Sequence, residues 1–245
     1  MQAAISIAAV LFWILMWKWA AEAIAVSFIL PKPEEVFLRL WELMKTSDFY
    51  RILFLSFLRV MAGFFWGGIL GFLFGTAAHF FYPLRALLNP LMAMVRATPV
   101  ASFILVVILL AEREEVPTVI SLMMVLPVVW QNTLLGFSSR DPKLTEMAKV
   151  FSIGPIRRFF RVDLPQVLPF VFSAAQTSLG LAWKAGVAAE VLALPKVSVG
   201  MMIYDAKLYL QTPDLYAWTL AIIAFSVLLE RLLLLSFAGK GGNHA

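Results

Sequence analysis

The sequence predicts an all-α integral membrane protein with about six transmembrane helices and one long cytoplasmic loop. Its 245 residues are 62% hydrophobic and 14% charged, whereas soluble domains average about 45–50% apolar and about 25% charged residues. The chain also contains apolar runs of the roughly 20 residues that a helix needs to cross a hydrocarbon core of about 30 Å. These runs are 3–25, 52–78, 87–111, 115–136, 166–194 and 216–238.

The N-terminal run, 3–25, is predicted to be a retained first span. It has no basic segment before it and no clear cleavage site after it, so it does not match a secretory signal peptide. The segment 26–51 follows, and its amphipathic stretch 36–44 is too short and too charged to span a membrane. We expect this segment to lie at the outer interface. The rest of the chain, 52–238, is expected to form a five-helix core that includes the loop 137–165.

The distribution of charge predicts the orientation of the bundle. The loop 137–165 carries six Lys or Arg against three acids, whereas the loop 112–115 is mostly acidic. The positive-inside rule places the first loop in the cytoplasm and the second outside. Counting spans from there puts both termini in the cytoplasm, with 239–245 as a flexible tail. Segment 26–51 falls outside in this arrangement although it carries four cations, which are interspersed with four acids.

The inventory of reactive residues argues against catalysis. The chain has no cysteine and only two histidines, so it is poorly supplied for disulfide, zinc or thiol chemistry. It contains no G-x-x-x-x-G-K-[ST] phosphate loop and no H-E-x-x-H motif. The net charge of +5 suits membrane orientation better than nucleic-acid binding. We therefore expect a protein of the cell membrane that has no metal site and no catalytic activity of its own.

A stripe of glycines runs along the second apolar run, at Gly63, Gly67, Gly71 and Gly75. Residues four apart lie on one face of a helix, and small residues there let another helix approach closely. The stripe is explained equally well by tight packing within one subunit and by contact with a second subunit.

The loop 137–165 is predicted to fold into two short helices. Asp141-Pro142 is a good helix start, because Asp caps the first amides and Pro suits the first turn. The stretch 152–155, Ser-Ile-Gly-Pro, ends this helix, and a second one is predicted from Ile156 to about Val162. Leu164-Pro165 then begins the next span. A loop of roughly 29 residues is long for a plain connection, so we expect it to dock a soluble partner.

This loop resembles the signature of the membrane-spanning permease subunit of type I ABC importers. That signature reads Glu-Ala-Ala, three residues, Gly, nine residues, Ile-x-Leu-Pro. Two positions depart from it, since Met147 replaces the first Ala and Ser152 replaces the Gly, while Gly154 lies two residues late. The matching positions are Glu146, Ala148, Val162, Leu164 and Pro165.

The likeness extends over about residues 28–235, to the nitrate, sulfonate, taurine and thiamine-precursor branch of this family. It rests on the stretches 30–33, 58–64, 96–99 and 181–190. The stretch 96–99, Arg-Ala-Thr-Pro, is also expected to break its helix. The resemblance implies that a second copy of this chain forms a homodimer with the first. It also implies two ATP-binding subunits and an extracytoplasmic substrate-binding protein. ATP and Mg would then be bound by the partner ATPase. The substrate would be a small organic or inorganic anion or a molecule like a thiamine precursor.

The resemblance also implies which loop residues meet the ATPase. Glu146 would be the anion that faces the partner, Ala148 would let the helix seat closely, and apolar neighbours would supply contact area. The residues expected to dock the ATPase are Glu146, Met147, Ala148, Phe151, Ser152, Gly154, Ile156 and Arg157.

Polar residues inside the apolar runs are candidates for the translocation path, because a charge within the bilayer costs about 2.5–3.5 kcal/mol on insertion scales. Lys184 and Glu190 are six residues apart and do not share a helix face. Either could instead pair with a charge on another span. The path residues predicted from the sequence are Arg96, Thr98, Gln176, Ser178, Lys184 and Glu190.

An ion-coupled secondary transporter or channel is the alternative function. It would explain Lys184 and Glu190 within the fifth run. It would not explain the long basic loop, and the absence of a visible internal repeat weighs against many such transporters.

Overall fold

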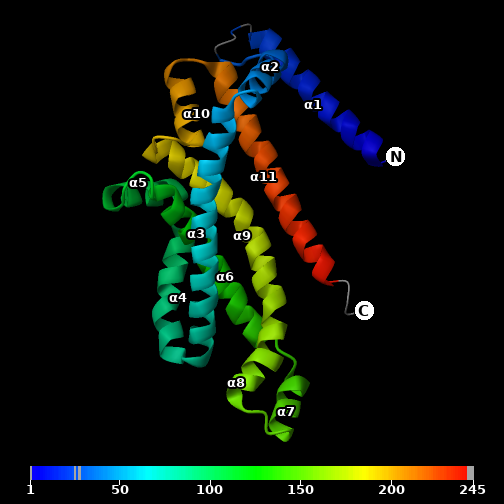
Figure 1. Ribbon diagram of the computed structural model, residues 1–245, viewed down its shortest axis with the longest axis vertical. Helices are drawn as coiled ribbons and strands as arrows, with labels where there is room; N and C mark the ends of the chain where they lie inside the picture. The colour runs from blue at the N-terminus through cyan, green and yellow to red at the C-terminus, as the bar shows by residue number, and fades with distance from the viewer. Residues whose placement is uncertain (1, 25, 27–28, 242–245) are drawn as a thin grey trace.

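The computed structural model describes residues 2–24, 26 and 29–241, and the regular elements in this part of the chain are all helical (Figure 1). This confirms the predicted all-α fold. In chain order the elements are α1 (Gln2–Ile24), α2 (Pro33–Met44), α3 (Ser47–Phe80), α4 (Tyr82–Ala97), α5 (Val100–Leu110), α6 (Val116–Ser138), α7 (Pro142–Val150), α8 (Pro155–Arg158), the π-helix η1 (Phe159–Asp163), α9 (Leu164–Ala193), α10 (Val199–Leu208) and α11 (Thr212–Gly241).

The centre of the bundle is formed by α3, α6 and α9, which pack against one another along much of their length (Figure 1). An apolar cluster joins the three helices through Val60 and Phe64 on α3, Val129 on α6, and Trp183 and Val187 on α9. In lipid, such side chains hold helices together mainly by close van der Waals contact. The loop helices α7 and α8 lie together at one end of this centre, which we call the α7 end.

The glycine stripe of α3 packs against α6 of the same chain. A Cβ added to Gly71 would lie 2.7 Å from the Leu126 carbonyl oxygen, and one added to Gly75 would lie 2.7 Å from the Thr133 Cβ. Gly63 and Gly67 are equally crowded, whereas Gly68 has no atom within 4 Å of an added Cβ. The stripe therefore serves packing within the subunit, one of the two explanations that the sequence left open.

The third apolar run does not form one straight helix. It breaks at Thr98-Pro99 into α4 and α5, which are inclined by 109°. Pro99 has no N–H to continue the ladder, and the Thr98 hydroxyl donates to the Met94 carbonyl at 2.8 Å. The helix break expected at residues 96–99 is confirmed.

By length and composition, α3, α6 and residues 212–232 of α11 can each cross a membrane, and the bent pair α4–α5 adds a fourth crossing if it counts as one. Among the described residues, α1 and α9 lie outside this group. The multi-pass architecture is thus confirmed, and the count of six spans stays a prediction.

The fifth run ends at Ala193, as expected from the sequence. Leu194 has a left-handed backbone with φ 56°, and the chain turns there so that α10 packs back against α9 and α11. At the other end of α11, residues 239–241 continue the helix. The remaining positions of the predicted tail, 242–245, lie outside the described residues.

The amphipathic stretch 36–44 forms the predicted helix, α2, which begins at Pro33. An ion pair between Arg39 and Asp214 ties it to the first turn of α11. Helix α1 diverges from the bundle (Figure 1) and meets the rest of the chain near α2, where the Trp17 indole donates to the Pro31 carbonyl at 3.1 Å.

Candidate functional site

Helix α7 of the loop begins as the sequence predicts. Asp141 is its N-cap, and the Asp141 carboxylate accepts a hydrogen bond from the Lys143 N–H at 2.8 Å. Pro142 occupies the first helical position, where a missing N–H costs nothing.

The end of α7 is closed by Ser152 in the left-handed region, with φ 51°. The Ser152 N–H donates to the Lys149 carbonyl at 3.0 Å, and the Ile153 N–H donates to the Ala148 carbonyl at 2.9 Å. This pair of hydrogen bonds is the Schellman motif, in which the left-handed position is usually Gly. Ser152 therefore keeps the backbone geometry of the signature Gly, and Gly154, with φ −57°, does not replace it.

We expect Ser152→Gly to stabilise the loop, because a left-handed backbone costs a non-glycine residue about 1–2 kcal/mol. Hydrogen exchange of the Ile153 amide should slow by about 5–30-fold. Gly154→Ala is the matched control and should leave this rate unchanged, since φ at Gly154 is ordinary and no atom lies within 4 Å of an added Cβ. A Ser152→Gly variant with unchanged exchange would show that residue 152 carries no strain.

The second half of the loop differs from its prediction. The sequence predicted a separate helix from Ile156 to Val162 and a new span beginning at Leu164-Pro165. Instead, α8, η1 and α9 follow one another without an interruption, and the Leu164 N–H donates to the Phe159 carbonyl in a π-turn. A π-turn is wider than an α-turn and leaves room for the Pro165 ring, so the proline does not break the helix. The loop is thus continuous with α9.

The loop presents an exposed apolar surface. Phe151 is 73% exposed and Ile156 is 76% exposed, and the predicted docking residues Glu146, Met147 and Arg157 are exposed beside them. The structure adds exposed residues that the sequence analysis missed. Phe160 lies four residues after Ile156 on the same helical face, and this spacing could have identified Phe160 from the sequence. The added residues are Val150 and Phe160.

Ala148 faces the opposite way. It is only 1% exposed, because the face of α7 that carries it packs against the rest of the loop. In this structure Ala148 lets the loop fold closely on itself, and its role in letting α7 seat closely on a partner stays a prediction.

The loop is fixed to the bundle by Arg140. Its guanidinium forms an ion pair with the buried Asp163 carboxylate at 2.5 Å and lies 3.0 Å from His79 Nε2. It also donates to the Phe137 carbonyl at 2.8 Å. Arg158 contacts the same carboxylate at 3.5 Å. These contacts join the ends of α3 and α6 to η1, so the loop and the central helices form one connected unit.

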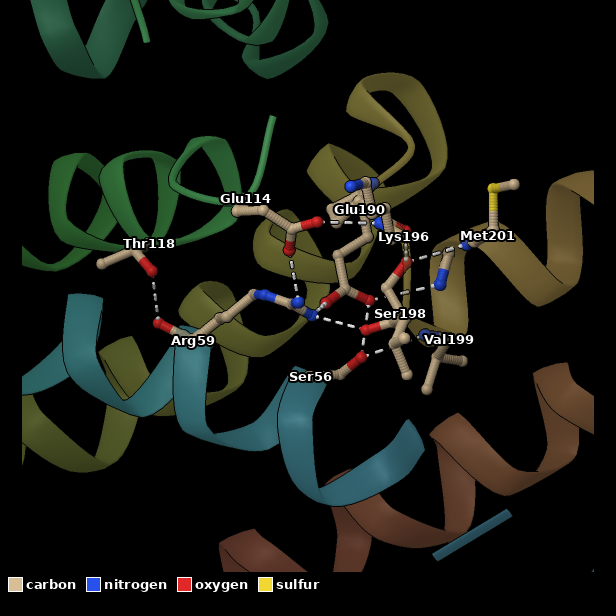
Figure 2. A network of polar contacts seen from close by, with 12 residues as sticks. Ser56, Arg59, Glu114, Thr118, Glu190, Lys196, Ser198, Val199 and Met201 are labelled. Carbon is tan, nitrogen blue, oxygen red and sulfur yellow. Dashed lines mark hydrogen bonds and ion pairs between the residues drawn. The ribbon is translucent and has the colours of Figure 1, made fainter. Parts of the chain in front are cut away.

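A second group of charged residues lies within the bundle, toward the end opposite α7 (Figure 2). Glu190 on α9 is fully buried, and its carboxylate lies 3.5 Å from the Arg59 guanidinium on α3. Arg59 also pairs with Glu114 from the turn between α5 and α6 and donates to the Val197 carbonyl at 2.8 Å. The network thus joins α3, the 112–115 turn and the α9–α10 turn.

Hydrogen bonds complete this network. The Ser56 hydroxyl donates to the Glu190 carboxylate at 2.8 Å and accepts from the Val199 N–H at 3.0 Å. The Gly200 N–H donates to the same carboxylate at 3.2 Å. The Lys196 N–H, in the turn between α9 and α10, donates to the Glu114 carboxylate at 2.9 Å and so links this turn to the 112–115 turn. Glu190 is therefore a structural anchor, the alternative that the sequence left open, and it does not line an open path.

The other predicted path residues differ in their exposure to solvent. Ser178 is buried in the core, and its hydroxyl donates to the Ala175 carbonyl at 3.3 Å, while its assignment to the path stays a prediction. Arg96 is exposed on α4 and donates to the Gln131 side chain on α6. Lys184 is exposed on α9. Two polar residues, Thr98 at the helix break and Gln176 on α9, are half-buried.

These features define a helical membrane subunit with a rigid exposed loop and polar helix faces, as a transporter requires. The chain belongs to the family of binding-protein-dependent transport system inner membrane components, which residues 63–238 match. It is a transport permease of the ABC type, and the resemblance stated from the loop motif is confirmed.

Relatives support the same assignment. SsuC of Bacillus subtilis (strain 168), named for the transport of aliphatic sulfonates, is 33% identical over 201 residues, which are 81% of this chain and 71% of SsuC. The bicarbonate transport system permease protein CmpB of Synechococcus elongatus is 27% identical over 179 residues, 72% of this chain and 64% of CmpB. The nitrate import permease protein NrtB of Leptolyngbya laminosa is 28% identical over 154 residues, 62% of this chain and 54% of NrtB.

Proposed function

We propose that this chain forms the translocation path of an ATP-driven importer and docks its ATPase through the loop 140–165. The observation that carries the proposal is the exposed surface of that loop, where Phe151, Ile156 and Phe160 stand clear of the chain beside Glu146. Exposed apolar groups at the polar end of a membrane bundle favour a protein partner.

The anchoring of the loop suggests how movement passes to the membrane. ATP binding would close two ATPase subunits against each other and displace the docked loops. Because the loop continues into α9 and is tied to α3 and α6 through Arg140 and Asp163, its displacement would tilt the central helices. ATP and Mg would be held by the ATPase, and this chain would bind neither.

The substrate that we propose is a small anion, or a molecule like a thiamine precursor. Relatives named for sulfonate, bicarbonate and nitrate support an anion. The exposed cations Arg96 on α4 and Lys184 on α9 also favour negative charge in the path. A binding protein outside the membrane would deliver the substrate, and a second copy of this chain would complete the path.

The orientation that goes with this function places the α7 end and both termini in the cytoplasm. The loop between α6 and α9 is rich in Lys and Arg, whereas the turn between α5 and α6 is mostly acidic, which supports this arrangement.

We expect Glu146→Lys and Phe151→Ala each to weaken ATPase association by about tenfold or more, because interface anchors typically contribute more than 1 kcal/mol each and often 2 or more. The measurement is the amount of ATPase that copurifies with the permease. Membrane insertion and the melting temperature should be unchanged, since both side chains are exposed. Glu112→Lys is the matched control, because it reverses an exposed acid in the turn at the other end of the bundle.

Normal copurification of the ATPase with both loop variants would contradict the docking role. Uptake into proteoliposomes gives an independent test, because an importer of this kind requires ATP and the ATPase. Uptake driven by an ion gradient alone would instead support the secondary-transporter alternative.

A further inference from the structure

A cleft of about 290 Å³ lies between α4 and α6, and both polar and apolar side chains line it. Helix α4 contributes Arg85, Asn89 and Arg96, which are separated by four and seven residues and share one face. Helix α6 contributes Gln131 and Ser138 to the facing wall. The volume is at the small end of the range for ligand pockets, which suits a ligand of a few atoms.

The two arginines of the cleft lack a carboxylate partner. Among the described residues, no ion pair joins Arg85 or Arg96 to an Asp or Glu. The Arg96 guanidinium donates to the Gln131 side-chain oxygen and to the Met92 carbonyl. A guanidinium has five N–H groups in all, so further donors remain. The cleft therefore combines two uncompensated cations with unused donors.

A buried donor points to the same chemistry. Trp130 lines the cleft and is only 3% exposed, yet its Nε1–H has no acceptor among the described residues. A buried N–H without a partner costs about 1–3 kcal/mol. Trp130 and Arg96 line the same cleft, so the residue with this unsatisfied donor belongs to the cleft wall that also carries the inner arginine.

The polar face cannot be turned toward lipid chains. Arg85 lies in the first turn of α4 and could reach the membrane surface, but Arg96 lies eleven residues further along, about 16 Å deeper. Both side chains are exposed within the single chain, as are Asn89 and Gln131. A charged residue at such depth faces water or another protein.

We propose that the α4–α6 cleft binds a small oxyanion, with Arg85 and Arg96 supplying the positive charge and the Trp130 indole N–H supplying a neutral donor. Planar guanidinium groups match the geometry of sulfonate, nitrate, bicarbonate and phosphate oxygens. The oxyanion is either a free anion on its way through the path or the phosphate of a phospholipid. The first of these sources rests on the proposed transport function, whereas binding itself does not.

The test measures binding of radiolabelled sulfate to the purified complex of permease and ATPase in an uncharged maltoside detergent, free of phospholipid and of nucleotide. We expect saturable binding that unlabelled nitrate and methanesulfonate displace. Arg85→Gln and Arg96→Gln should each weaken sulfate affinity by about tenfold or more, because each removes hydrogen bonds between charged groups. Trp130→Phe keeps the ring and should weaken affinity by a few-fold to tenfold.

Arg113→Gln is the control, since it removes an exposed positive charge in the turn between α5 and α6, outside the cleft, and should leave sulfate affinity unchanged. Unaltered melting temperatures and ATPase copurification establish that the cleft variants fold. Wild-type protein that binds no sulfate saturably would overturn the proposal, and so would cleft variants that bind as tightly as the wild type.

Adding phosphatidylglycerol to the same phospholipid-free samples distinguishes the two sources. If this lipid displaces sulfate from the wild type, the occupant is a phospholipid phosphate. If it does not, the occupant is a free anion. The ATPase that copurifies in the same samples tests the proposed function separately, because loss of the ATPase would sink docking without affecting sulfate binding to the permease.

Discussion

Replacing Gly71 with alanine is expected to lower the melting temperature of the purified protein by about 2–12 °C. The new Cβ would lie 2.7 Å from the Leu126 carbonyl oxygen and 2.9 Å from the Val129 Cβ. Both atoms belong to α6, so α3 and α6 must separate to admit it. Overpacking of this kind typically costs about 1–3 kcal/mol, and each kcal/mol shifts the melting temperature of a chain this size by about 2–4 °C. Gly67→Ala with Gly71→Ala should have a larger effect.

The matched control is Gly68→Ala, which lies next to Gly67 but outside the stripe. No atom lies within 4 Å of a Cβ added to Gly68, and its alanine would gain helix propensity of up to about 1 kcal/mol. Thermal unfolding followed by loss of the monodisperse chromatographic peak should therefore show an unchanged or higher melting temperature for Gly68→Ala. Equal shifts for Gly71→Ala and Gly68→Ala would show that the contact between α3 and α6 is not what the stripe provides.

The features that the sequence predicted correctly are those that depend on neighbouring residues. The start of α7 at Asp141-Pro142 follows from capping chemistry, and the break after Arg96 follows from Pro99, which has no N–H. The amphipathic α2 follows from a period of polar and apolar residues. In each case the physical cause lies within about one helical turn.

The features that were missed or mistaken depend on residues far apart in the chain. The partner of Glu190 is Arg59, 131 positions earlier, and no local pattern identifies it. The inward direction of Ala148 depends on how the loop folds onto the bundle, and Ser178 is buried only because α9 is central. The continuity through Pro165 arises from a π-turn, which has no clear sequence signal. The sequence therefore indicated which residues are unusual, and the structure assigns their partners.

Arg59→Met is expected to cause the largest loss of stability, about 3–5 kcal/mol, because it leaves the Glu190 carboxylate buried without its cation. At about 2–4 °C per kcal/mol, the melting temperature should fall by about 6–20 °C. Glu190→Gln should cost much less, since its carboxamide oxygen can still accept from the Ser56 hydroxyl and the Gly200 N–H. Arg59 would also keep Glu114 as a partner.

The double variant Arg59→Met/Glu190→Met separates the cost of an orphaned charge from the contribution of the pair. Removing both charges should recover much of the stability that Arg59→Met loses, because a buried ion pair contributes little relative to apolar packing. A double variant no more stable than Arg59→Met would mean that the ion pair itself stabilises the fold. The pair still has a geometric role, because the Gly200 N–H donates to Glu190 and the Val199 N–H donates to Ser56. Faster hydrogen exchange at Gly200 than at Val199 in the double variant would then show that Glu190 is there to fix the turn into α10.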